Sequence, residues 1–362
     1  MTEVARSPSV DVVVPVRNGA RFIVSCLDSV RAQTLQPNSV IVVDDGSIDT
    51  TPEILEEYAR RWPKLRVIRS VPRGVSHARN RGLEISHAPF TAFLDSDDIW
   101  CPEKLERQLA LFMAGGPHLG FVHCACFQID EQGEVLSDSP ISVPQWRGDI
   151  FREMIEGFYH IAGSSSAVVA RRELIQEAGG FDETLSCGED LDLWLKLAHM
   201  SRVDYVSAPL VGLRVHSGNT CSQSLRQNPE LVLLQRLKIW NKWSDHIADQ
   251  SGVLAGFRRE AVSVSMASLL RRRPEFGLYG RLKRSDLPLA RCLFGGVSGY
   301  IQIRPRISIA YNWAKFIIAT RLIMRNPLLL RICLRFGRLK YLSRSLNHGP
   351  GAKTSFDGRL RS

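Results

Sequence analysis

Short apolar runs in this chain end in carboxylates, and helical patterns separate them. Residues 39–44 are β-branched and lead into Asp44-Asp45, and residues 90–94 lead into Asp95-Ser96-Asp97-Asp98. Apolar runs of this length are typical of strands buried on both faces of a parallel sheet. Carboxylates repel one another, so grouping three at a strand end is costly unless a cation lies between them. The second run therefore predicts a site for a hard divalent metal that holds a phosphate-bearing ligand.

Strand and helix patterns alternate through the first part of the chain. Strands are predicted at residues 9–16, 39–44, 65–68 and 89–94, each followed by a helical pattern. This alternation predicts an α/β fold with a mostly parallel, doubly wound sheet. Ligands of such sheets bind at the carboxyl ends of the strands, where both acidic groups lie.

The pattern is less regular in the middle of the chain and becomes helical after about residue 225. Middle strands are predicted at residues 119–129, 164–170, 203–206 and 210–215, with helices at 171–178 and 189–199. A further helix is predicted at residues 231–243. We expect an N-terminal tail (1–8), an α/β domain (9–225), a helical basic region (226–347) and a disordered tail (348–362).

Charge is distributed unevenly between these parts. From residue 250 onward the chain has 22 Lys/Arg and 4 Asp/Glu, a net charge of +18. The preceding part has 25 basic and 33 acidic residues, a net charge of −8. An acidic body with a basic C-terminal region predicts two parts that meet different partners.

The N-terminal residues, the hydropathy pattern and the cysteine spacing all bear on the cellular compartment of the protein. The first residues are polar and lack an apolar signal core, and no apolar run approaches the ~20 residues of a spanning helix. The eight cysteines include no Cys-x-x-Cys pair, which favours free thiols in a reducing environment. We therefore expect a cytoplasmic protein.

Five motifs occur in order between about residues 9 and 217, and together they resemble a known family. They are residues 12–18 (VVVPVRN), 44–47 (DDGS), 74–82 (GVSHARNRG), 95–98 (DSDD) and 188–190 (GED). In this order they resemble a bacterial family 2 inverting glycosyltransferase of the A-fold. The resemblance implies transfer of a sugar from a nucleotide-diphospho-sugar, by our expectation a UDP-sugar, to an acceptor hydroxyl. It also implies a role in synthesis of a cell-surface polysaccharide or glycolipid.

The resemblance implies donor-binding roles for residues of the first three motifs. Asp45 would accept the N3–H of the donor base, and Pro15, Arg17 and Asn18 would lie beside the nucleotide. Relatives often have an aromatic residue where Arg17 stands, and a guanidinium plane can also stack on a base. Arg79 would lie near the diphosphate and ribose, where a fixed cation suits a phosphate oxygen. Asp-Gly turns and solvated helix faces are the ordinary structural alternatives for these residues.

The fourth motif is implied to hold the metal. Asp97 would bind Mn²⁺ or Mg²⁺, and Asp95 would contact the ribose or a metal-bound water. His216 falls where relatives carry a histidine near the diphosphate, so it would be a further metal ligand or a phosphate contact. We expect Asp98 to cap the helix that follows it.

The fifth motif is implied to supply the proton chemistry. Transfer needs a general base to take the proton of the attacking hydroxyl, and the resemblance assigns that role to Asp190. Glu189 would contact the substrate beside it. A single base on the face opposite the leaving group accounts for inversion, as it does in inverting glycosidases. Acids that stabilise a helix N-terminus are the structural alternative.

Other functions and partners remain open at this level. A nucleotidyltransferase or a dehydrogenase would show a Gly-rich loop after the first strand, and residues 17–21 are not one. A non-catalytic nucleotide-sugar-binding module would share the fold. The acceptor would be a carbohydrate or a lipid-linked sugar. The basic C-terminal region would bind the anionic inner face of the plasma membrane or pack as a helical subdomain, and no motif favours nucleic acid.

Overall fold

The computed structural model describes residues 8–136, 143–155, 161, 164–218, 235 and 238–243, all within the unit Met1–Arg291. Its strands are β1 (Val10–Val16), β2 (Ser39–Asp44), β3 (Leu65–Arg69), β4 (Phe90–Phe93), β5 (Ile99–Trp100), β6 (Leu119–Ile129), β7 (Val169–Arg171) and β8 (Arg202–Arg214). Its α-helices are α1 (Ile23–Arg31), α2 (Thr51–Arg61), α3 (Val75–Ile85), α4 (Lys104–Gly115), α5 (Phe151–Ile155), α6 (Arg172–Glu177) and α7 (Glu189–Met200). A 3₁₀ turn, Ser165–Ala167, precedes β7.

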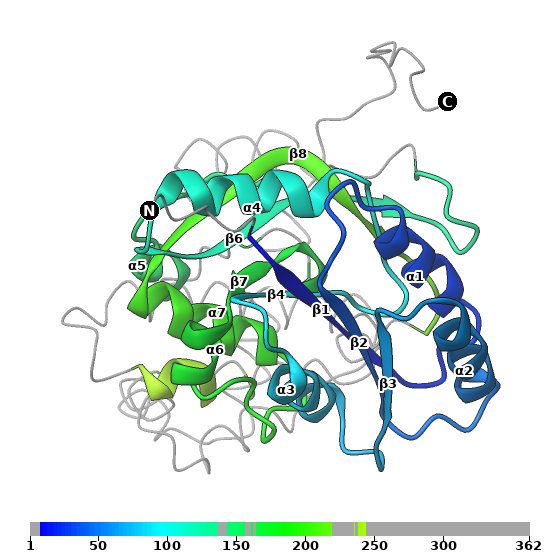
Figure 1. Cartoon of the computed structure of the whole chain (residues 1–362). Coiled ribbons are helices and arrows are strands. Elements are labelled where there is room, and N and C mark those ends of the chain that lie inside the picture. The colour runs from blue at the N-terminus through cyan, green and yellow to red at the C-terminus, as the bar shows by residue number, and fades with distance from the viewer. Residues whose placement is uncertain are drawn as a thin grey trace, which may run out of the picture. The chain divides into compact units, whose positions relative to one another are not determined.

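The strands form one mixed sheet in the order β3-β2-β1-β4-β7-β6-β8-β5 (Figure 1). The first four strands in this order are parallel, and β6 is parallel to β8. β7 runs antiparallel between β4 and β6, and β5 runs antiparallel beside β8. The predicted mostly parallel α/β sheet is therefore confirmed, with two short antiparallel strands added to it.

Helices cover both faces of the sheet, so the central strands are buried on both sides (Figure 1). One core joins alternate residues of β1 to buried residues of α1, α2 and α4, among them Leu27, Leu55 and Leu109. On the other face Ala78 of α3 packs on β2, and Trp194 of α7 stacks on Phe121 of β6. α3 and α7 therefore lie on the same face of the sheet.

Gly82 lets α3 lie close against β1. A Cβ added there would lie 2.4 Å from Cγ1 of Val13, and both residues belong to the packed interior. Any side chain at this position would push α3 off the sheet. The short distance between α3 and the strands brings Arg79, one turn earlier on the helix, to the sheet edge.

Some predicted elements differ from those observed. Residues 203–206 and 210–215 were predicted as two strands, but one irregular strand, β8, covers both. The expected helix cap at Asp98 is wrong, because Ile99–Trp100 forms β5 and α4 begins only at Lys104. The predictions for residues 1–7 and 244–362, and most of those for 219–237, lie outside the described residues. Within the described part, no helix has the length and apolar character needed to cross a membrane.

Candidate active site

The carboxyl ends of β1, β2, β4 and β8 meet at one edge of the sheet, since these strands run in the same direction. The predicted site residues lie at or just after these strand ends, within the first two turns of α3, or on the first turn of α7. Gly188 directly precedes α7 at this edge, and its φ of 78° is in the left-handed region that favours glycine. Loops and helix N-termini of this kind are where ligands of α/β sheets bind.

Arg79 forms a buried bridge between two of the predicted acids. Its Nη1 donates to Oε1 of Glu189 at 2.8 Å, and its Nη2 donates to Oδ1 of Asp95 at 2.7 Å. The Arg79 side chain is 4% exposed, and its guanidinium lies over the ring of Phe181. Burial acts to lower its pKa, but the charges of Asp95 and Glu189 outweigh this and raise it. The bridge holds the end of β4 and the start of α7 together.

Asp190 lies beside this bridge at the start of α7. Desolvation and the neighbouring charge of Glu189 raise its pKa to about 6, against a partial lowering by Arg79. Oδ1 accepts a hydrogen bond from the N–H of Leu191 at 2.7 Å. A carboxylate with a pKa near neutrality is suited to take a proton from a hydroxyl and to release it again. Its position and its pKa are consistent with the predicted general base.

Asp97 and His216 come together from loops that lie 119 residues apart in the chain. Nε2 of His216 lies 2.9 Å from Oδ2 of Asp97, and the imidazole packs against the ring of Phe22. The N–H of Gly218 donates to Nδ1, so in this arrangement Nε2 carries the proton that Asp97 accepts. Burial and the charge of Asp95 raise the pKa of Asp97, and the hydrogen bond from His216 opposes this rise.

A buried polar frame, which sequence reasoning missed, fixes the acidic loop. Oδ2 of Asp98 accepts from Oγ of Ser166 at 2.6 Å, and Oδ1 accepts from the N–H of Arg214 at 3.0 Å. The guanidinium of Arg214 donates to the carbonyl of Asp97 at 2.8 Å, and Oγ of Ser166 accepts from the N–H of Asp95 at 3.0 Å. Burial raises the pKa of Asp98, as do the charges of Asp97 and Asp95. Asp98 thus anchors the loop. The sequence signal for a role of Arg214 was its position as a basic residue directly after the apolar run 210–213.

Asp45 holds the loop before α3 in this structure. Its two carboxylate oxygens accept the backbone N–H groups of Arg73 and Gly74, each at 2.8 Å. Each oxygen keeps a second lone pair. The predicted bond from Asp45 to a donor base therefore stays a prediction, in which the base N–H would be an additional donor to a carboxylate already oriented by α3.

The three residues of the first loop lie at the same edge. Pro15 is buried in β1, and its missing N–H is tolerated because the ladder with β4 ends before it, at Val13. Asn18 has a φ of 52° and accepts the N–H of Ile48 at 2.9 Å, which ties this loop to the loop after β2. Arg17 is exposed. These positions leave Arg17 accessible to a ligand at the ends of β1 and β2.

The donor set for a divalent cation consists of carboxylates and one imidazole. Asp97 and His216 are in contact, and Asp95 is two residues from Asp97. Carboxylate oxygens suit Mg²⁺ and Mn²⁺, and an imidazole nitrogen favours Mn²⁺ over Mg²⁺. No preformed group of three or more His, Cys, Asp or Glu side chains suited to a metal is found among the residues that the structure describes. The observed pair fits a cation whose remaining ligands come from the substrate.

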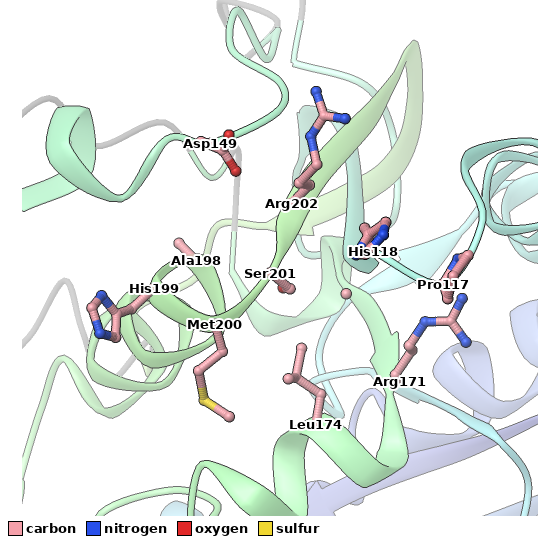
Figure 2. A pocket seen from close by; sticks show the side chains of 11 residues that line it. Pro117, His118, Asp149, Arg171, Leu174, Ala198, His199, Met200, Ser201 and Arg202 are labelled. Carbon is pink, nitrogen blue, oxygen red and sulfur yellow. The ribbon is translucent and has the colours of Figure 1, made fainter.

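A cavity of about 390 Å³ lies away from these acids, at the amino ends of β6 and β8 (Figure 2). It is lined by His118, Arg171, His199 and Arg202 together with Asp149, among others. None of the predicted site residues lines it. The candidate site is therefore the carboxyl edge of the sheet, where the acids gather, and not this cavity.

Sequence comparisons agree with the resemblance. Residues 11–178 match the family model described as Glycosyl transferase family 2. The putative glycosyltransferase EpsH of Bacillus subtilis is 31% identical, over 58% of this chain and 62% of its own length. The chondroitin synthase of Escherichia coli is 28% identical, over 61% of this chain and 31% of its own. An uncharacterized glycosyltransferase of Rickettsia prowazekii is 28% identical, over 62% of this chain and 69% of its own.

Solved structures share the fold. S. aureus TarS 1-349 in complex with UDP-GlcNAc aligns with a TM-score of 0.59 at 20% identity, covering 79% of this chain and 83% of that one. The mannosyltransferase PcManGT from Pyrobaculum calidifontis, in complex with GDP-Man and Mn²⁺, aligns at 0.52 and 18% identity, covering 88% and 87%. The mixed sheet is thus that of the A-type nucleotide-sugar transferases. Residues 11–178 of this chain are therefore similar to the glycosyl transferase family 2.

Proposed function

We propose that this chain transfers a sugar from a nucleotide-diphospho-sugar to an acceptor hydroxyl in a single displacement with inversion. The observation that carries this proposal is the Arg79 bridge, which joins the donor-side acid Asp95 to Glu189, the neighbour of Asp190. The bridge sets an acid at the end of β4 and a base of raised pKa at the start of α7 on one edge of the sheet. Inverting displacement needs a leaving-group site and a base on opposite sides of the sugar.

On the donor side, Asp45, Pro15, Arg17 and Asn18 would receive the nucleotide. UDP-GlcNAc occupies the TarS structure and GDP-Man the PcManGT structure, which supports a nucleoside-diphosphate donor without choosing its base. Arg79 would act on the donor through Asp95, because its side chain is only 4% exposed and both Nη groups point at carboxylates. We keep a UDP-sugar as the expected donor.

Asp97 and His216 would hold a divalent cation, Mn²⁺ or Mg²⁺. When bound, such an ion neutralises charge on the diphosphate leaving group. Mn²⁺ is present in the PcManGT complex, which supports this assignment. Because Nδ1 of His216 accepts the N–H of Gly218, ligation through Nε2 would require the imidazole to change tautomer. The chain's own contribution is to hold Asp97 in place through Arg214 and the Asp98–Ser166 pair.

On the acceptor side, the Asp190 carboxylate would accept the hydroxyl proton as the oxygen attacks the anomeric carbon. The bond from that carbon to the diphosphate oxygen breaks, and the diphosphate leaves without needing a proton. The acceptor would be a carbohydrate or a lipid-linked sugar, in surface polysaccharide or glycolipid synthesis. Attachment to an anionic membrane through the basic region 250–362 would be part of this role, and that region lies outside the described residues.

The test is a screen of UDP- and GDP-sugars with Mn²⁺, with and without acceptor sugars. We expect at least one nucleotide sugar to raise the melting temperature and to release its nucleoside diphosphate. The anomeric configuration of the product, read by proton NMR, is expected to be inverted. Retention of configuration would contradict the single displacement, and stabilisation without release of nucleotide would favour a binding module.

A further inference from the structure

A segment beyond the predicted α/β domain contacts the helix that carries the candidate base. Residues 238–242 are helical, and Ile239, Trp240 and Trp243 are buried. Cδ1 of Ile239 lies 3.2 Å from the position that a Cβ on Gly188 would take, so the segment meets the backbone immediately before Glu189. We define residues 238–243 as the docking segment.

Ring contacts anchor the docking segment at the other end of α7. The ring of Trp243 lies 4.8 Å from that of Phe151 and 5.1 Å from that of His199, centroid to centroid. The segment therefore follows α7 from Gly188 to His199. Its apolar side chains supply most of the favourable burial, since indole and aliphatic groups lose water there.

Lys242 adds an ionic contact that is specific in position. Its Nζ donates to Oδ1 of Asp192 at 2.7 Å and to Oδ2 of Asp182 at 2.6 Å. Asp192 lies on the first turns of α7 and is fully buried, and Lys196 is its other cationic partner, at 3.0 Å. A buried carboxylate that loses one partner is strongly destabilised. Lys242 therefore stabilises α7 where Glu189 and Asp190 are located.

The same ammonium group also ties down the loop that leads into α7. Asp182 and Asp192 stand on either side of residues 183–191, and one Nζ binds both. α3 holds the opposite side of this loop, because Asn80 donates to the carbonyl of Phe181 at 2.9 Å and to Glu183 at 3.1 Å. With Lys242 removed, the loop would keep its contacts to α3 and the Arg79 bridge but would lose the shared cation that joins Asp182 to Asp192.

We propose that Lys242 is a positioning residue that holds Asp190 in its productive place by clamping Asp182 to Asp192. The inference rests on the proposed function, since it takes Asp190 as the base. It also moves the functional boundary of the catalytic unit from residue 225 to at least Trp243. A displacement of about 1 Å at a reacting group can cost about a hundredfold in rate, so loss of this clamp acts on kcat.

The experiment compares three full-length variants. Lys242→Met removes the ammonium, and Lys242→Arg keeps a charge that can reach both carboxylates. Lys238→Met is the matched control, an exposed lysine one helical turn before Lys242 in the same segment. We expect Lys242→Met to lower kcat by about tenfold or more with the donor KM within about threefold of wild type. We expect Lys242→Arg to restore kcat and Lys238→Met to leave it unchanged.

Amide hydrogen exchange of residues 182–192 provides a readout that does not require turnover. Faster exchange there in Lys242→Met, but not in Lys238→Met, supports the clamp. A lower melting temperature with unchanged kcat, or unchanged exchange across these residues, would overturn it. If wild-type protein turns over no nucleotide sugar, the proposed function fails, while the exchange measurement still decides whether Lys242 orders the start of α7.

Discussion

Replacing Arg79 by Met would remove the link between Asp95 at the end of β4 and Glu189 at the start of α7. The Arg79 side chain is 4% exposed, and its guanidinium binds Asp95 and Glu189 at 2.7 and 2.8 Å. Methionine fills a similar volume but leaves two carboxylates facing each other without their shared cation. The Asp95 and Glu189 side chains are themselves only 25% and 13% exposed, so solvent compensates them poorly.

The expected cost follows from this burial. Removing one partner of a buried ion pair costs about 3–5 kcal/mol. One kcal/mol shifts the melting temperature of a domain of this size by about 2–4 °C, so we expect a decrease of roughly 6–20 °C. The charge of Arg79 also lowers the pKa of Asp190, so its loss raises that pKa and moves the acidic limb of the rate–pH profile to higher pH.

Arg81→Met is the matched control for the thermal measurement. Arg81 lies on the same helix, but its side chain is 44% exposed and its partner Glu84 is 58% exposed. Exposed pairs are worth about 0–1 kcal/mol, so this variant should melt within a few degrees of wild type. Arg79→Lys keeps a charge without the two-pronged geometry and should be intermediate. If Arg79→Met and Arg81→Met melted at the same temperature, the buried bridge would be refuted.

Three further outcomes follow from the described geometry. Since Asp190 must be ionised to act and has a pKa of about 6, kcat/KM should fall about tenfold per unit below pH 6; a plateau down to pH 4.5 would contradict this role. Burial acts to raise the pKa of Asp11, but the N–H donors of Ala88, Asn38 and His87 and the hydroxyl of Ser86 lower it overall. Stability from Asp11 is thus present above its unfolded pKa and lost in acid, and Asp11→Ala should flatten the stability–pH profile in urea denaturation. Removing divalent ions with EDTA should abolish transfer and Mn²⁺ should restore it, with a higher Mn²⁺ requirement in Asp97→Asn; full activity in EDTA would exclude a metal there.

Local patterns predicted most of the first four strands and the helices between them. The β-branched runs of β1 and β2 and the proline that opens α2 are signals within the chain itself. The strand predicted at residues 164–170 overlaps β7 only at its end, because residues 165–167 form a 3₁₀ turn. The antiparallel pairing of β7 with β4 and β6 was not predictable from that pattern. The order of the sheet therefore depends on contacts that no local pattern carries.

The candidate site was predictable as a set of residue types and less so as a set of contacts. The ordered motifs predicted Asp95, Asp97 and Asp190 as site residues, and in the structure all three lie at one edge of the sheet. The partners of Arg79 were not predictable, because Glu189 lies 110 residues away and meets it only after the sheet forms. Acids favour helix caps, which predicts that role for Asp98, but Asp98 precedes β5 and is a buried acceptor for the N–H of Arg214. The contact of Lys242 with Asp192 was not predictable either, because the two residues lie 50 residues apart in the chain.

The most direct test of the account is the separation of donor binding from transfer in Asp190→Asn. Asparagine keeps the size of the side chain and cannot accept the proton, while Asp45, Asp95 and Asp97, the residues proposed to bind the donor and its metal, are untouched. We expect the dissociation constant for the donor, measured calorimetrically with Mn²⁺, to stay within about threefold of wild type. Transfer should fall by about 10²–10⁴-fold, the usual contribution of a general base. Transfer at the wild-type rate in Asp190→Asn would contradict the central claim that this carboxylate is the base.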